Sequence, residues 1–383
     1  MLKRAAGAAG DVWAARFPAQ ALARAQKLLA AQHFTRAAKL LGAAAEAGLA
    51  EAQYALALRY LLGEGVAASP EQAGLWFQRA AAAGHAGAQV KLASLHLAGL
   101  PEEFLVQAGL FSHGETRVDF AAAAHWAEQA ALAGNAEACT LLAFILTAAP
   151  PPWRDEPRAE NLYEAAAAQG HAQAQLALGL LRLRQAQTSA GIALIEQAAV
   201  AGLPHAHDAL GAIFENAVGT DQNFTRSVAH YRIAAEAGMA RAQARYGLAL
   251  LLGRGVAANA LTAETWLRKA ALAGSEEAAL RLGRLYAEPS DLPPNYAEAT
   301  LWFTRAAEAG NAEAARALGI FALNGLGAVR DPVQAAAWFR RAAQAGDSAG
   351  AHNLAICLAE GIGVPRDQAE AALWRQKAAL PPA

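Results

Sequence analysis

The sequence predicts an all-α protein, a right-handed solenoid of about ten helix-turn-helix repeats. Three observations in the 383-residue chain indicate this fold class: a glycine that recurs every 36 residues, a large side chain eight residues before it, and a glycine-containing loop earlier in the same unit. The spacing departs from 36 twice, at 50 residues before Gly134 and at 32 residues before Gly202. The recurring glycines are Gly48, Gly84, Gly134, Gly170, Gly202, Gly238, Gly274, Gly310 and Gly346. Such a period is typical of stacked hairpins, because one helical hairpin cannot bury its apolar face alone.

The unit that ends at Gly84 shows the elements that each repeat is expected to contain. Apolar residues four apart, including Leu56, predict a first helix with one apolar face. The loop at Gly63–Val66 breaks that helix, because its two glycines permit left-handed dihedral angles. A second helix is predicted to begin at Ser69 as N-cap, with Pro70 in its first turn, and to end at Gly84.

A slot eight residues before each recurring glycine holds a large side chain in most repeats. We interpret this slot as part of the packing between repeats rather than as a ligand-binding aromatic box, because packing accounts for every member. Its occupants are Leu40, Trp76, Trp126, Leu162, Leu194, His230, Trp266, Trp302, Trp338 and Trp374.

The repeated unit resembles the Sel1-like repeat family, a relative of the tetratricopeptide repeat. The resemblance rests on units such as Ala312–Gly346 and Ala242–Gly274, and it covers about residues 35–380. It implies a helical solenoid that acts in protein interactions, as Sel1-like adaptors of bacteria do.

The pattern also predicts the division of the chain. We expect a flexible N-terminal segment at 1–18 and a tetratricopeptide-like hairpin at 19–48, which lacks the glycine loop. The Sel1-like array is expected at 49–383, with an insertion at about 99–117 and a C-terminal capping helix around Trp374.

Composition narrows the functional classes. The net charge of −1 offers no overall field to attract nucleic acid, and no apolar run is long enough for a transmembrane helix. No cofactor is predicted, and no metal site, because His205 and His207 are two residues apart and do not share a helix face. Cys139 and Cys357 are expected to be unpaired, buried side chains. These features favour a cytoplasmic protein, or a periplasmic one if the true N-terminus carries a signal.

The insertion is the longest departure from the repeat. It contains several apolar side chains, among them Phe104, Leu105 and Phe111. Two interpretations remain open: the segment packs over the solenoid, or it is a binding loop for a partner.

The resemblance also implies where a partner would bind, since first helices line the inner groove of tetratricopeptide proteins. Groove positions carried over to this chain predict a partner-binding row made of Arg241, Arg245, Arg281, Arg284, Arg316, His352 and Asn353. Arginine binds carboxylates in a bidentate manner, so the expected partner is an acidic or C-terminal peptide segment. The alternative is a solvated face on which Glu277 and Glu313 neutralise their neighbours.

The sequence therefore favours a non-catalytic protein-protein interaction scaffold. No motif of a nucleophile, a metal hydrolase or a phosphate-binding loop is present in the sequence. A receptor for a glycan or small molecule, with Tyr54 and Phe144 as groove aromatics, is one alternative. A β-lactam-binding enzyme, as reported for some Sel1-like proteins, is the least favoured.

Overall fold

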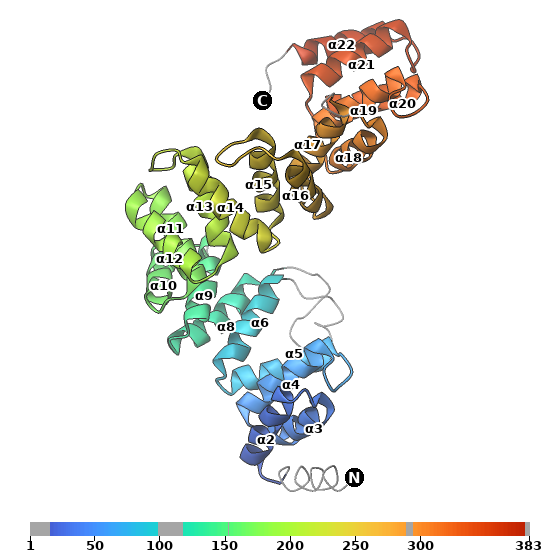
Figure 1. Ribbon diagram of the computed structural model, residues 1–383. Coiled ribbons are helices and arrows are strands. Elements are labelled where there is room, and N and C mark those ends of the chain that lie inside the picture. Colours follow the sequence, from blue (N-terminus) through green and yellow to red (C-terminus); the bar gives the residue numbers. More distant parts are fainter. Residues whose placement is uncertain (1–15, 99–117, 152, 289–293, 380–383) are drawn as a thin grey trace. The chain divides into compact units, whose positions relative to one another are not determined.

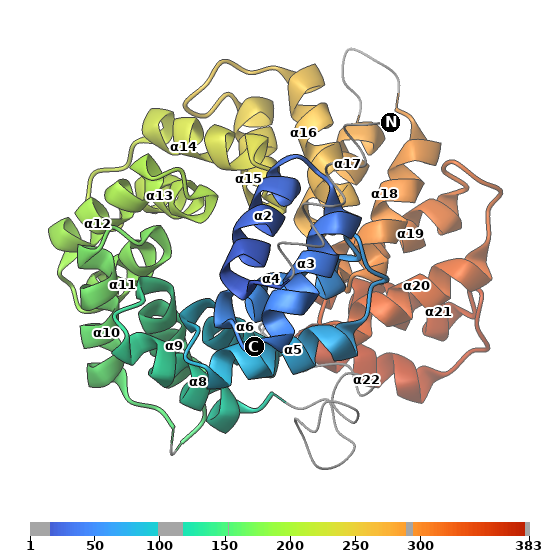
Figure 2. The same ribbon diagram turned by 90° about the horizontal axis from the view of Figure 1, so that it is seen from below.

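A computed structural model describes residues 16–98, 118–151, 153–288 and 294–379, and these residues form helices and connecting turns without any strand. The all-α fold class is thereby confirmed. The chain divides into two compact units, one up to Ala201 and one from Gly202. Within each unit the helices follow one another in chain order, each beside the one before it (Figure 1, Figure 2). Residues 1–15 of the predicted N-terminal segment, and the insertion with Phe104, Leu105 and Phe111, lie outside the described residues.

The described residues of unit 1 form five helical hairpins. In each hairpin the first helix packs along the second. The pairs are α2 (Pro18–Ala30) with α3 (Phe34–Glu46), α4 (Ala50–Leu62) with α5 (Pro70–Ala82), α6 (Ala86–Ala98) with α8 (Phe120–Leu132), α9 (Ala136–Ala148) with α10 (Glu156–Ala168), and α11 (Ala172–Arg184) with α12 (Thr188–Val200).

Unit 2 continues the same construction. Its pairs are α13 (Pro204–Asn216) with α14 (Phe224–Glu236), α15 (Ala240–Leu252) with α16 (Ala260–Leu272), α17 (Glu276–Ala287) with α18 (Tyr296–Glu308), α19 (Ala312–Asn324) with α20 (Pro332–Gln344), and α21 (Ser348–Glu360) with α22 (Gln368–Ala378). In both units the first helix of a repeat also packs on the second helix of the repeat before it.

Local sequence signals explain where these helices begin and end. The Ser69 hydroxyl accepts a hydrogen bond from the backbone N–H of Gln72, and Pro70 occupies the first turn of α5, as predicted. Gly253 ends α15 in the left-handed conformation with φ 66°. These caps satisfy backbone groups that the helix itself leaves without partners.

The glycine loop also joins neighbouring repeats. Gly255 has φ 69°, and a Cβ placed on it would lie 2.3 Å from the carbonyl carbon and oxygen of Phe224, the first residue of α14. In the same way, a Cβ placed on Gly363 would lie 1.9 Å from the carbonyl oxygen of Pro332 at the start of α20. Only a residue without a side chain fits here, so the second glycine of the loop permits close contact between repeats.

The slot eight residues before each recurring glycine is a packing position, but its side chains are not the most buried ones of the repeat. Trp76 is 9% exposed and Trp302 is 3% exposed, whereas Trp338 is half-buried. The residue that follows the slot is more deeply buried at Phe77 and Phe339, and Phe303 is as buried as Trp302. Phe303 fits against a glycine of the first helix, Gly283, where an added Cβ would lie 2.4 Å from the ring. Large rings of second helices therefore fill notches left by glycines of first helices.

Two hairpins have loops of only three residues. The loop between α11 and α12 holds Ala186 at φ 60°, and the loop between α2 and α3 holds Gln32 at φ 58°. The deletion before Gly202 falls within the α11–α12 loop, which lacks the two glycines found in hairpins such as α15–α16. Cys139 in α9 and Cys357 in α21 are free and buried.

Candidate partner-binding surface

The first helices of unit 2 share one face. Helix α17 contacts α19, and α19 contacts α21, in addition to the contacts that each makes with second helices. Ion pairs link the side chains of successive first helices along this row. We call the exposed side of α13, α15, α17, α19 and α21 the first-helix face of unit 2.

Arg241 and Arg245 belong to this face and both have acidic partners. The Arg241 guanidinium lies 3.3 Å from Oδ2 of Asp208 on α13. Arg245 lies between two carboxylates, 4.0 Å from Glu215 on α13 and 3.8 Å from Glu277 on α17. The row on α15 therefore connects three consecutive first helices.

Arg284 and Arg316 continue the same pattern toward the C-terminus. Arg284 forms an ion pair with Glu313 on α19. Arg316 lies 3.3 Å from the carboxylate of Asp347, the N-cap of α21, and 3.9 Å from Glu313. The arginines and carboxylates thus alternate in a ladder, and each partly exposed pair contributes at most about 1 kcal/mol to stability. The predicted role of this row in binding a partner stays a prediction.

Arg281 differs from the other four arginines. Within the described residues it forms no ion pair, and its Nε atom is buried without a hydrogen-bond partner. A buried donor without an acceptor costs roughly 1–3 kcal/mol relative to a satisfied one. Arg281 is therefore the one member of the arginine row for which the described residues supply no carboxylate partner.

The remaining predicted groove residues lie on α21. His352 is exposed and Asn353 is half-buried, and both precede the buried Leu354. They extend the first-helix face of unit 2 by one repeat beyond Arg316.

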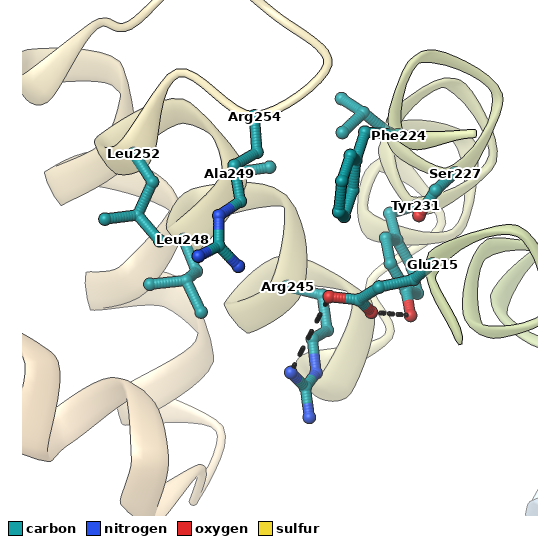
Figure 3. A pocket seen from close by; sticks show the side chains of 10 residues that line it. Glu215, Phe224, Ser227, Tyr231, Arg245, Leu248, Ala249, Leu252 and Arg254 are labelled. Atoms are coloured by element: carbon teal, nitrogen blue, oxygen red, sulfur yellow. Dashed lines mark hydrogen bonds and ion pairs between the residues drawn. The ribbon is translucent and has the colours of Figure 1, made fainter. Parts of the chain in front are cut away.

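A small cavity with both polar and apolar lining lies beside the ladder, between α13, α14 and α15 (Figure 3). The Tyr231 hydroxyl donates a hydrogen bond of 2.7 Å to Oε2 of Glu215, and the other oxygen of that carboxylate faces Arg245. Burial, followed by the hydrogen bond with Glu215, raises the pKa of Tyr231, so this hydroxyl stays protonated at neutral pH. The cavity measures about 20 Å³, which is room for about one water molecule.

Two histidines of unit 2 meet across a hairpin. Nδ1 of His207 on α13 lies 3.0 Å from Nδ1 of His230 on α14. Burial lowers the pKa of His230 to about 4, and the nearby His207 and Arg226 add to this effect. The described parts of the chain contain no group of three metal-binding side chains. Sequence reasoning assigned His230 to the packing slot but missed its contact with His207, which lies 23 residues away in the sequence.

Unit 1 carries a different surface on its first helices. Two adjoining hollows of about 300 and 480 Å³ share Tyr163 and Ala177, and together they follow α9 and α11. Phe144 is 52% exposed and Leu180 is 43% exposed in these hollows. We call the two hollows together the unit 1 groove.

Tyr54, the other aromatic residue predicted for a glycan-binding groove, is half-buried in its own repeat contacts. Its ring stacks on His85 with 4.4 Å between centroids and an interplanar angle of 22°. The side chain of His85 also contacts Glu51 at 3.0 Å. One face of the Tyr54 ring is therefore covered by the next repeat rather than open to a sugar.

The family of the chain follows from its repeats. The Sel1 repeat model matches residues 50–85, 107–135, 136–171, 204–239, 240–275, 276–311, 312–347 and 348–380, which is more than half of the chain. The chain belongs to the Sel1 repeat family. The model does not match the short-looped hairpins α2–α3 and α11–α12, which lack the glycine loop.

Solved structures show the same fold for this Sel1 repeat protein. It is 25% identical to c5321 of uropathogenic Escherichia coli, described as a protective antigen with an SLR fold, with a TM-score of 0.66 over 94% of this chain and 76% of that one. A Sel1 repeat protein from Oxalobacter formigenes is 29% identical, with a TM-score of 0.50 over 53% of this chain and 84% of that one. No curated protein matches the chain.

Sel1 repeat proteins are generally protein-interaction scaffolds, and this chain has their α-solenoid fold. Among the helices that the structure describes, none is both long and apolar enough to cross a membrane.

Proposed function

We propose that this Sel1 repeat protein is a non-catalytic scaffold that binds an extended segment of a partner protein along its first helices. The observation that carries the proposal is the first-helix face of unit 2, where five successive first helices are linked by charged side chains. The small cavity beside this face holds about one water molecule, and the hollow of about 380 Å³ at Arg241, Arg245 and Glu277 is shallow and open to solvent. The surface therefore suits an extended chain better than an enclosed small substrate.

Arg281 is the proposed anchor of this surface. Its neighbours Arg245 and Arg284 are paired with Glu277 and Glu313, so a partner carboxylate would meet one cation that has no competing partner. A guanidinium can hold a carboxylate with two parallel hydrogen bonds. The proposed partner segment therefore carries an aspartate, a glutamate or a C-terminal carboxylate that binds Arg281, while its other residues follow the ladder.

The proposal is tested by comparing the proteins captured by the intact chain and by charge variants, identified by mass spectrometry. Arg281→Glu should abolish capture, and Arg281→Met, which keeps the apolar stem but removes the charge, should weaken it at least tenfold. Capture should also fall as the salt concentration rises, because exposed charge contacts are screened beyond about 8 Å at physiological ionic strength.

The matched control is Arg232→Glu on the second helix α14. Arg232 is 58% exposed in its side chain and pairs only within its own helix, 3.8 Å from Glu236. This variant should capture the same proteins as the parent. Partners that remain bound to Arg281→Glu would place the binding surface elsewhere, and an unchanged circular dichroism spectrum would show that folding is not the cause of any loss.

A further inference from the structure

The unit 1 groove is lined mainly by helices α9 and α11, which are green in Figure 1. Val90 and Ser94 of α6 also line one of its two hollows, and Tyr163 of α10 forms the floor that both hollows share. Tyr163 is 6% exposed, and burial raises the pKa of its hydroxyl. The floor is therefore a fixed, uncharged ring rather than a side chain that can move aside.

The lining of the groove is mostly apolar and open to solvent. Phe144 projects from α9 with 52% of its surface exposed, and Leu180 projects from α11 with 43% exposed. Both side chains line hollows that meet at Tyr163 and Ala177. Single exposed apolar residues are common on proteins, but two large ones in one hollowed surface are typical of a site that a partner covers.

Opposite charges lie at the two ends of the groove. Glu137 is in the first turn of α9, and Arg184 is the last residue of α11. Neither forms an ion pair within the described residues of unit 1. Each charge interacts favourably with the dipole of its own helix, and each remains available to a partner.

The length of the groove sets the length of its occupant. From Glu137 to Thr147, both of which line the hollows, α9 advances by about 15 Å at 1.5 Å per residue. An extended peptide covers the same distance in about five residues at roughly 3.3 Å each.

We propose that the unit 1 groove binds a short extended segment of a partner protein, about five residues long, with large apolar side chains in its centre. A basic residue of that segment lies at Glu137, and a carboxylate lies at Arg184. This inference rests on the proposed scaffold function but concerns a second surface, which is mainly apolar whereas the arginine row is charged. Apolar burial against Phe144 and Leu180 supplies affinity, and the two end charges set the direction of the segment.

The test uses a fluorescein-labelled peptide of sequence Lys-Leu-Phe-Leu-Glu, blocked at both ends, and fluorescence polarisation with the full chain. The parent should bind the peptide measurably, and Phe144→Ala should weaken binding about tenfold or more, as expected for a central aromatic contact. The matched control is Leu132→Ala on α8, which removes a side chain that is 78% exposed and lies outside the groove. This control should bind the peptide as the parent does.

A charge exchange separates recognition from a structural role of the same residues. Glu137→Lys should bind the peptide less tightly than the parent but should bind Glu-Leu-Phe-Leu-Glu more tightly than the parent does. Loss of binding to both peptides, or no change for either, would refute the assigned end charge.

Other occupants give distinct results. If sedimentation shows a dimer that Phe144→Ala converts to a monomer, the groove is covered by a second copy and the proposal is wrong. If replacing residues 101–117 by a short loop strengthens peptide binding tenfold, the chain itself covers the groove and the proposal is wrong. Failure of the peptide to bind the parent refutes this inference alone, because the Arg281 variants test the scaffold function at unit 2 independently.

Discussion

Replacement of Trp302 by alanine is the most direct test of how the repeats hold together. Trp302 is 3% exposed, its Nε1 donates a 3.0 Å hydrogen bond to Glu298, and the Arg268 guanidinium lies 5.1 Å from its ring. A buried tryptophan removes about 150–250 Å² from water, worth about 4–6 kcal/mol at 25 cal/mol per Å². Residual burial in the unfolded chain reduces this, so we expect Trp302→Ala to lower the free energy of unfolding by about 3–5 kcal/mol.

The assay is urea denaturation followed by far-ultraviolet circular dichroism, with hydrogen exchange read by mass spectrometry. Repeats couple mainly to their neighbours, so exchange should rise first in α16 to α19 and later in α13. The matched control is Trp338→Ala, where the half-buried ring lies under Arg341 at 5.4 Å and the loss should be about half as large. An unchanged urea midpoint for Trp302→Ala would refute the packing interpretation of the slot.

Two further predictions concern stability. Gly255→Ala should destabilise unit 2 by about 2–3 kcal/mol in urea denaturation, because the added Cβ would lie 2.3 Å from the Phe224 backbone. The control Gly42→Ala, which has open space around the added Cβ, should stabilise the protein by up to about 1 kcal/mol. Equal effects of the two substitutions would contradict the close contact at Gly255. His230 has a pKa of about 4 in the folded chain and about 6.5 when unfolded, so the unfolded state binds more protons between these values. The free energy of unfolding should therefore be highest above pH 6.5 and fall toward pH 4. The two pKa values correspond to a loss of about 3 kcal/mol, and partial exposure of the ring to solvent reduces the expected loss to about 2 kcal/mol. His230→Leu should remove this loss, which thermal melts at several pH values would measure.

The helices and their boundaries could be predicted because the signals that set them are local. Ser69 and Pro70 start α5, and Gly253 and Gly274 end their helices, through contacts within a few residues of sequence. The 36-residue period then required that hairpins stack, since neither helix buries its apolar face alone. The family and the fold class followed from the same repeats.

The sequence could place Arg245 and Arg281 on one face of consecutive first helices, but it could not distinguish them. Arg245 lies within 4.0 Å of Glu215 and Glu277, which belong to neighbouring repeats, whereas Arg281 has an Nε without any partner. The periodicity assigns both residues to equivalent surfaces, while the distance to a carboxylate about 30 residues away depends on how the repeats pack.

What the sequence by itself determined is therefore the repeat, the helices and the side of each helix that faces a neighbour, because capping and helical periodicity act over a few residues. The tertiary structure decided how residues at equivalent positions of the repeats differ in burial and in contacts. Trp302 is buried and Trp338 is only half-buried, and Phe144 and Leu180 come together in one groove. These differences depend on side chains one repeat away, and a local pattern carries no information about that packing.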